Sequence, residues 1–102
     1  MIDASAFARI KKGATFVNTA RGPLLDYDAL YDALVGGHLR GAMLETFAGE
    51  PPPADWPPLH LPNVTLTPHI AGASPRAVTL ATDMAAEEVR RHIAGEPPLN
   101  PC

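Results

Sequence analysis

Residues 14–18 read Ala-Thr-Phe-Val-Asn, and residues 19–23 continue Thr-Ala-Arg-Gly-Pro. The first five residues are short, apolar and partly β-branched, which predicts a strand that is buried on both faces of a sheet. Gly22 and Pro23 then predict a sharp turn, with Arg21 just before it. A doubly buried strand of this kind is typical of an α/β protein with a parallel sheet.

Five further elements alternate around this strand. They are predicted helices over residues 4–11, 27–35 and 75–94, and predicted strands over residues 41–47 and 64–67. Asp3, Asp26 and Ser74 are suitable N-caps for the three helices, and Gly95 is a suitable terminator of the last one. The order of elements predicts an α/β fold: a partial Rossmann-like, doubly wound parallel sheet that lacks the N-terminal, glycine-rich βαβ half.

Proline is concentrated in residues 50–62, out of 12 prolines in the chain of 102 residues. Such a stretch can form neither a regular helix nor a central strand, so we expect an ordered surface loop. Trp56 is expected to hold this loop against the body of the protein.

The composition narrows the range of functions. The formal net charge of −3 is unfavourable for binding nucleic acid, because no face can be dominated by Lys and Arg. A single cysteine, Cys102, permits no disulfide within the chain and fits a cytoplasmic protein. No apolar run approaches the roughly 20 residues that span a bilayer, and no secretory signal is recognisable at the N-terminus.

Polar residues that could carry chemistry follow each predicted strand. Arg21 follows the first strand, Glu45 and Glu50 the second, and His69 the third. Ligands of open α/β sheets bind at the carboxyl ends of the strands, where these loops should meet.

The three residue types at this edge suit one reaction. A guanidinium can hold a substrate carboxylate by two parallel hydrogen bonds. An imidazole can take the hydroxyl proton while hydride leaves the same carbon, and a nearby carboxylate favours its protonated form. Arg21, His69 and a carboxylate from Glu45 or Glu50 therefore indicate oxidation of a 2-hydroxy acid, or reduction of a 2-keto acid.

Simpler interpretations of these residues also exist. Arg21 could be a turn residue paired with Asp26 or Asp28, and His69 and Glu50 could be ordinary loop residues. The spacing of the histidines matches no metal motif, so we expect no metal site.

Three stretches resemble the D-isomer-specific 2-hydroxyacid dehydrogenases. They are Asn18-Thr-Ala-Arg-Gly-Pro-Leu24, Gly41-Ala-Met-Leu-Glu-Thr-Phe-Ala-Gly-Glu-Pro51 and Asn63-Val-Thr-Leu-Thr-Pro-His-Ile-Ala-Gly72. They occur in the family's order and spacing, and phosphoglycerate and glycerate dehydrogenases look most similar. The resemblance implies an oxidoreductase that uses NAD, with NADP left open, on a small 2-hydroxy or 2-keto acid.

The resemblance also implies roles for individual residues. Arg21 corresponds to the substrate-binding arginine, His69 to the acid/base histidine and Glu50 to its carboxylate partner. Positions that line the cofactor correspond to Thr19, Ala20, Arg21, Glu45, His69 and Gly72. Glu45 departs from the family pattern, which has Asp there to contact the nicotinamide carboxamide.

The family's chain is several times longer than this one. The glycines of this chain never fall into the Gly-x-Gly-x-x-Gly spacing that cradles a pyrophosphate. We therefore expect residues 1–73 to be the C-terminal part of an NAD-binding domain, and residues 74–102 to be a helix and tail that return toward an absent substrate domain. The isolated chain is expected to be inactive.

Other interpretations stay open at this point. The chain could be a non-catalytic, self-associating segment, or could belong to a corepressor-type branch of the same superfamily. A homodimer is expected for the parent enzyme. The specific 2-hydroxy acid and the choice between NAD and NADP do not follow from the sequence.

Overall fold

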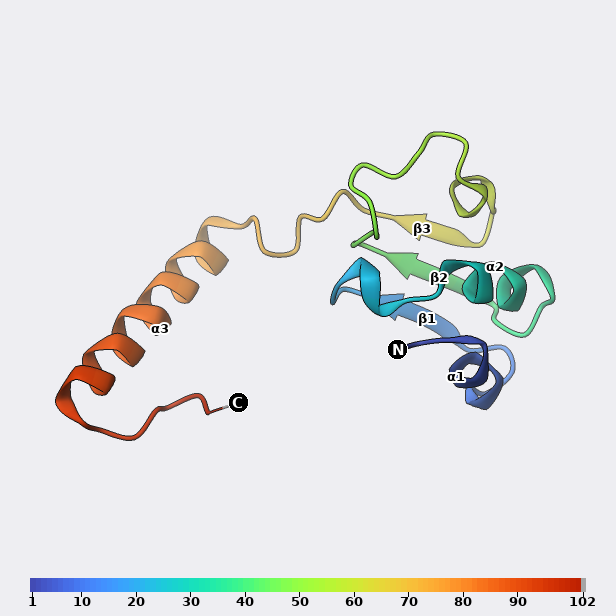
Figure 1. The fold of residues 1–102 in the computed structure, drawn as a ribbon. Coiled ribbons are helices and arrows are strands. Elements are labelled where there is room, and N and C mark those ends of the chain that lie inside the picture. The colour runs from blue at the N-terminus through green and yellow to red at the C-terminus, as the bar shows by residue number, and fades with distance from the viewer. Residues whose placement is uncertain (102) are drawn as a thin grey trace. The chain divides into compact units, whose positions relative to one another are not determined.

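The computed structural model describes residues 1–101 and consists of two compact units, Met1–His69 and the segment that begins at Ile70 (Figure 1). The first unit holds all three strands and the first two helices, and the second holds the last helix and the tail.

The first unit is built on a parallel sheet in the order β1-β2-β3, where β1 is Thr15–Asn18, β2 is Gly41–Leu44 and β3 is Val64–Leu66. Phe16 lies beside Ala42, which lies beside Val64. In the same register the last residues of the strands, Asn18, Leu44 and Leu66, are neighbours. The predicted α/β fold with a parallel sheet is confirmed, and the carboxyl ends of all three strands lie at one edge.

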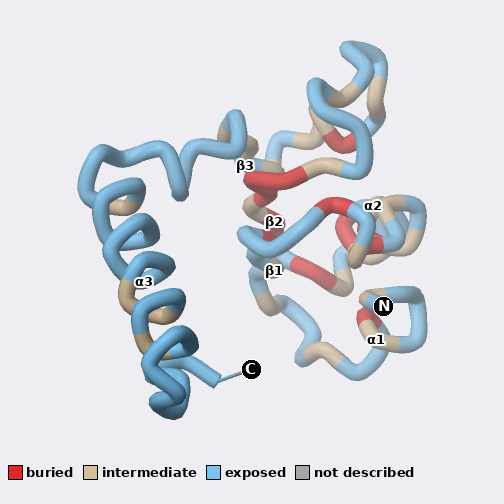
Figure 2. The backbone as a smooth tube through the Cα atoms, turned by 60° about the vertical axis from the view of Figure 1, so that its left-hand side comes forward, coloured by how far each residue is buried: buried red, intermediate tan, exposed pale blue. Residues whose placement is uncertain are grey.

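Two helices pack on one face of this sheet. Helix α1 spans Ala4–Arg9 and α2 spans Tyr27–Val35, and the carboxylates of Asp3 and Asp26 cap them by accepting the backbone N–H of Ala6 and Ala29. Figure 2 shows that the buried backbone is concentrated in α2 and β2. The core cluster consists of Phe7, Leu25, Leu30, Leu34, Leu39, Ala42 and Leu44.

The prediction that the first strand is buried on both faces was wrong. Phe16 packs against the core, but Val17 is 55% exposed on the opposite face. Next to Val17 in the register, Met43 is half-buried and Thr65 is exposed. An apolar strand sequence indicates that both faces of the sheet can be covered by other elements. The helices of this unit cover only one face, so Val17 on the other face is exposed.

The regular elements are shorter than their sequences suggest. Strand β2 ends at Leu44 rather than at Phe47, and α1 ends at Arg9 because Ile10 is extended. Two short 3₁₀ helices, Gly22–Leu24 and Pro57–His60, were not predicted. Each has proline at its first or second position, where the fixed φ and the missing N–H of proline suit the start of a helix.

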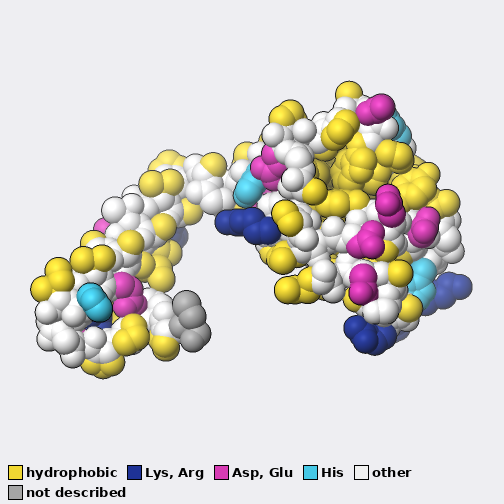
Figure 3. Space-filling model, in the orientation of Figure 1, with side chains coloured by type: hydrophobic (Ala, Val, Ile, Leu, Met, Phe, Trp, Pro, Cys, Tyr) yellow, Lys and Arg dark blue, Asp and Glu magenta, His cyan; other side chains and the backbone are white. Residues whose placement is uncertain are grey.

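The second unit is dominated by α3, which spans Pro75–Ala94 as predicted. The Ser74 hydroxyl accepts the N–H of Ala77 at its start, and Gly95 ends it in the left-handed conformation, with a φ of +69°. No residue of α3 is buried, and hydrophobic side chains are visible along it in Figure 3. Among the described residues, no helix combines the length and apolar character needed to cross a membrane.

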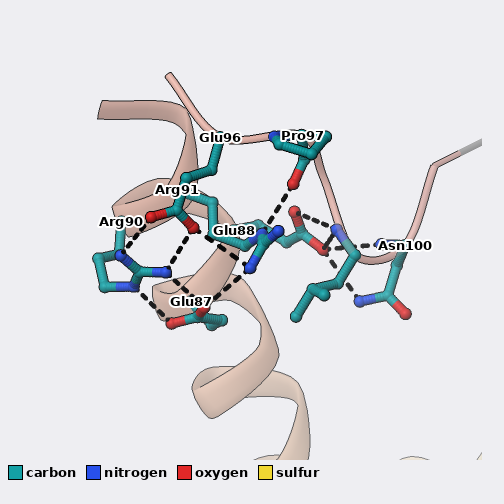
Figure 4. Close-up of polar contacts among 8 residues, drawn as sticks. Glu87, Glu88, Arg90, Arg91, Glu96, Pro97 and Asn100 are labelled. Carbon is teal, nitrogen blue, oxygen red and sulfur yellow. Dashed lines mark hydrogen bonds and ion pairs between the residues drawn. The ribbon is translucent and has the colours of Figure 1, made fainter. Parts of the chain in front are cut away.

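Hydrogen bonds and ion pairs connect the tail after α3 to the C-terminal part of that helix (Figure 4). The Glu88 carboxylate accepts hydrogen bonds from the backbone N–H of Leu99 and Asn100, at 3.1 and 2.9 Å. The Arg91 Nε donates to the Pro97 carbonyl at 2.7 Å. Arg90 also pairs with carboxylates on both sides of the helix end, those of Glu87 and Glu96.

Candidate active site

Polar side chains gather in the loops that follow the three strands of the first unit. Arg21 follows β1, Glu50 lies in the loop after β2, and His69 lies three residues after β3. All three are exposed, whereas Glu45, directly after β2, is only 4% exposed. The parallel topology therefore delivers a cation, carboxylates and an imidazole to one edge of the sheet.

The loop that carries Arg21 is organised by Asn18. The Asn18 side chain is 7% exposed, accepts the N–H of Ala20 at 3.0 Å and lies 3.5 Å from the Arg21 carbonyl oxygen. Arg21 itself donates from Nη1 to the Ala20 carbonyl at 2.6 Å. Thr19 and Ala20 are exposed on this loop. This role of Asn18 was not predicted, although an amide at the end of a strand and next to a turn is a recognisable signal.

Gly22 fixes the distance between the first two loops. A Cβ atom at Gly22 would lie 2.0 Å from the Phe47 carbonyl carbon and 2.3 Å from the Ala48 nitrogen. The backbone after Arg21 is therefore packed directly on the backbone that leads to Glu50. Only glycine permits this approach, since these neighbours are backbone atoms that cannot rotate away.

Glu50 and His69 form the central contact of the site. The imidazole Nδ1 lies 3.0 Å from Glu50 Oε2 and 3.2 Å from Oε1. Oε1 also accepts the backbone N–H of Phe47 at 3.0 Å, which holds the carboxylate from the opposite side. An ionised carboxylate can only accept, so Nδ1 carries the proton in this contact and Nε2 is left for another partner.

The surroundings of Glu50 keep its carboxylate ionised. The hydrogen bond with His69, and then that with the Phe47 N–H, hold the pKa of Glu50 below its ordinary value of 4.5. The positive charges of His69 and Arg21 also lower the pKa of Glu50, although by less than the hydrogen bonds do. The three side chains therefore share one electrostatic environment.

His69 stands in an unusual backbone conformation. Its φ is +54°, and it is the one non-glycine residue with a positive φ among the described residues. Its N–H donates to the Thr67 carbonyl at 3.0 Å, which makes a tight turn directly after β3. Conformations of this kind are uncommon outside glycine and occur preferentially at functional sites.

A pocket of about 230 Å³ opens beside the pair. It is lined by Phe47, Glu50, Pro51, Pro52, Pro68 and His69. The acid/base candidates thus face a concave, mostly apolar space, which is where a small organic ligand would bind.

The structure does not bring every predicted site residue into this cluster. Gly72 belongs to the second unit, so its role beside a nicotinamide stays a prediction. Within the described residues no ion pair links Arg21 to Asp26 or Asp28, and the Asp26 carboxylate instead caps α2. No group of three or more His, Cys, Asp or Glu that could hold a metal was found in the part of the chain that is described.

Comparison with protein families gives a match over residues 1–71. The matching family is described as "D-isomer specific 2-hydroxyacid dehydrogenase, NAD binding domain". The match covers the whole first unit and ends just beyond His69.

Individual relatives agree with this match. A D-3-phosphoglycerate dehydrogenase of Mycobacterium tuberculosis is 45% identical over 96 residues, which are 94% of this chain and 18% of the relative. A glyoxylate reductase of Korarchaeum cryptofilum is 43% identical over 98% of this chain and 30% of its own length. This chain therefore spans less than a third of either relative.

A solved structure is similar along nearly the whole chain. It is a D-isomer specific 2-hydroxyacid dehydrogenase from Xanthobacter autotrophicus Py2 in complex with NADPH and MES, with 43% identity and a TM-score of 0.78. The similarity covers 97% of this chain and 40% of that one.

Proposed function

Because the chain belongs to the D-isomer specific 2-hydroxyacid dehydrogenase family, we propose that it supplies the acid/base part of an oxidoreductase that interconverts a D-2-hydroxy acid and its 2-keto acid. The observation that carries this proposal is the contact between Glu50 and His69, at 3.0 Å, on the edge of the sheet where ligands of such folds bind.

His69 is the proton-transferring group in this proposal. Its Nδ1 is engaged by Glu50, so Nε2 faces the substrate oxygen, takes the hydroxyl proton during oxidation and returns it during reduction. Glu50 fixes the tautomer and favours the imidazolium that forms, because its carboxylate stays ionised. The reaction needs an imidazole that changes charge reversibly, and this pair provides it.

Arg21 is proposed to hold the substrate carboxylate. Its guanidinium offers a planar set of donors that can make two parallel hydrogen bonds to a carboxylate. The Asn18 turn and the close packing of Gly22 fix the loop from which it extends. A carboxylate held there would place the neighbouring carbon within reach of His69.

The residues at the strand ends suit the nicotinamide end of a dinucleotide. The Glu45 carboxylate can accept from a carboxamide NH₂, and Thr19, Ala20 and Gly72 are proposed to line the ring. NAD, or NADP as in the X. autotrophicus relative, would accept or supply the hydride. A pyrophosphate cradle is not among these 102 residues, so residues outside this chain would have to supply it.

The two alternative functions are less well supported. A purely self-associating segment gives no reason for an imidazole and a carboxylate to meet in a pocket. The relatives described above are named as dehydrogenases and reductases, which favours the enzyme over a corepressor.

The proposal extends to the setting of the enzyme. We propose a homodimer in the cytoplasm, acting on a small 2-hydroxy or 2-keto acid and on neither nucleic acid nor membrane. The exposed apolar residues Val17, Val78 and Val89 are consistent with further protein surface covering them. The net charge of −3 is consistent with a protein that does not bind nucleic acid, and the single cysteine is consistent with the cytoplasm.

The test uses the product of the whole open reading frame that encodes this chain. Reduction of glyoxylate, hydroxypyruvate, pyruvate and phosphohydroxypyruvate is followed with NADH and with NADPH. We expect turnover of at least one keto acid, and a fall in kcat/KM of about 10- to 100-fold in Arg21→Lys, since hydrogen bonds between charged groups contribute roughly 1.5–3 kcal/mol.

Arg40→Lys is the matched control, because Arg40 is exposed at the opposite end of the sheet, before β2. Folded protein that binds cofactor but reduces none of these acids would refute the proposed function. Equal losses in the two lysine variants would refute the role of Arg21.

A further inference from the structure

The central carboxylate of the site stands on a segment without regular structure. Residues 46–50, called the glutamate loop below, follow β2 and belong to no helix or strand. The Phe47 N–H holds the Glu50 carboxylate, but that bond lies within the loop itself. Contacts from outside the loop help to hold it in place, and one of them is the packing of Gly22 on the backbone of Phe47 and Ala48.

Tyr27 provides such a contact. It is the first residue of α2, directly after the N-cap Asp26, and its hydroxyl donates to the Thr46 carbonyl at 3.1 Å. Thr46 is 1% exposed, so water competes little for this bond. Burial raises the pKa of Tyr27, partly opposed by a hydrogen bond with the Ala48 backbone, and the hydroxyl therefore remains protonated and able to donate at neutral pH.

Trp56 holds the far side of the same region. Its ring packs edge-on against Tyr27, with centroids 5.0 Å apart, and edge-on against Phe47, with centroids 6.0 Å apart. Edge-to-face pairs at these separations contribute roughly 0.5–1.5 kcal/mol each. One indole thus connects the first turn of α2 to the glutamate loop.

The glutamate loop also borders a pocket of about 120 Å³, which is lined by Tyr27, Phe47, Ala48, Gly49, Pro52, Pro53 and Trp56. Phe47 itself packs against the core cluster, and Thr46 is buried. Tyr27 and Trp56 therefore contact the loop on the side where it borders this pocket.

We propose that Tyr27, supported by Trp56, is a positioning residue that holds the glutamate loop so that Glu50 meets His69. The contacts run from α2 through the Tyr27 hydroxyl to Thr46, through Phe47 to the Glu50 carboxylate, and from there to Nδ1 of His69. The effect of Tyr27 on catalysis rests on the proposed function, whereas its effect on the position of the glutamate loop does not.

A role in core packing alone makes a different prediction. In that case the ring of Tyr27 matters and its hydroxyl does not, so Tyr27→Phe would leave Glu50 as it is. In the positioning role, loss of the hydroxyl loosens the loop and weakens the Glu50–His69 contact. The two cases therefore separate in a single substitution.

The first experiment follows the Glu50 carboxyl carbon by NMR during an acid titration of this chain. The charged and titratable groups that face Glu50 are His69, Arg21 and Tyr27. We expect the pKa of Glu50 to lie below 4.5 in the wild type and to rise toward 4.5 in Tyr27→Phe. Tyr31→Phe, one turn further along α2, should leave it unchanged.

The second experiment measures activity in the product of the whole open reading frame. Tyr27→Phe should lower kcat by about 3- to 10-fold, the effect of one hydrogen bond, with cofactor affinity unchanged. An unchanged Glu50 titration in folded Tyr27→Phe would overturn the proposal. Should that variant fail to fold, Trp56→Phe is measured in the same titration, and an unchanged Glu50 there would overturn it equally.

The two experiments fail separately. A shifted Glu50 titration together with an inactive wild type would keep the positioning role and reject the proposed function. An active wild type together with an unshifted Glu50 titration in Tyr27→Phe would keep the proposed function and reject the positioning role.

Discussion

At the scale of single residues, the site depends on two backbone features as much as on side chains. His69 occupies a left-handed conformation, with a φ of +54°, at a cost of roughly 1–3 kcal/mol in positions of this kind. Gly22 lets two loops touch through their backbones. Both features place charged groups on one edge of the sheet, and both can be tested by substitution.

Gly22→Ala should destabilise the chain by roughly 1–3 kcal/mol, because the added methyl group meets the backbone of Phe47 and Ala48 and one of the two loops must move. Urea denaturation of the chain measures the change. Gly49→Ala is the control, since its Cβ would meet nothing within 4 Å. Equal stability in wild type and Gly22→Ala would contradict the close approach.

The Glu50 carboxylate should make the free energy of unfolding depend on pH in the acidic range. Its pKa is lowered in the folded protein, so its contribution is fully present above 4.5 and is lost as the pH falls through the lowered value. The difference in free energy of unfolding between wild type and Glu50→Gln should therefore shrink across this window. Asp55→Asn, an exposed carboxylate of the same proline-rich region, is the control, and a pH-independent difference would contradict the pairing.

At the scale of elements, the helix boundaries follow from local chemistry. Asp3, Asp26 and Ser74 cap the three helices, and Gly95 ends the last, as their residue types predict. The strands are less predictable from local sequence. Strand β2 continues in sequence as Glu45-Thr-Phe47, but its hydrogen-bonded ladder ends with its neighbours, at Leu44.

The Glu88 carboxylate is one of the groups that hold the tail against helix α3. Glu88→Ala removes the acceptor for the Leu99 and Asn100 amides, so their hydrogen exchange should become about tenfold faster or more, the effect expected for bonds to a charged group. NMR-detected exchange on this chain measures it. Asp83→Ala on the same helix is the control, and unchanged exchange at Leu99 in Glu88→Ala would contradict the contact.

At the scale of the whole molecule, the sequence predicted the parallel α/β order and the loops that carry Arg21, Glu50 and His69. Burial was harder to predict, because the exposure of Val17 depends on what packs over the sheet and not on the strand. The hydrogen bond between Tyr27 and Thr46 was also missed, since 19 positions separate the residues and Tyr27 lies outside the three stretches that resemble the family. Contacts between residues so far apart in the sequence can be identified only when the fold is known.

The predicted site residues are divided between the two units of the chain. Arg21, Glu50 and His69 lie in the first unit, whereas Gly72 lies in the second. Relatives extend well beyond the aligned region, by more than two thirds of their length in the two dehydrogenase and reductase examples. Catalysis is therefore tested on the product of the whole open reading frame, and local geometry on this chain.

The most direct measurement is the kcat of His69→Asn in the product of the whole open reading frame, with a 2-keto acid that the wild type reduces. Asparagine tolerates a positive φ, so the turn after β3 is retained while the proton-transferring ring is lost. We predict a fall in kcat of at least about 100-fold in protein that is folded and saturated with cofactor. A kcat close to that of the wild type would contradict the assignment of His69 as the acid/base group.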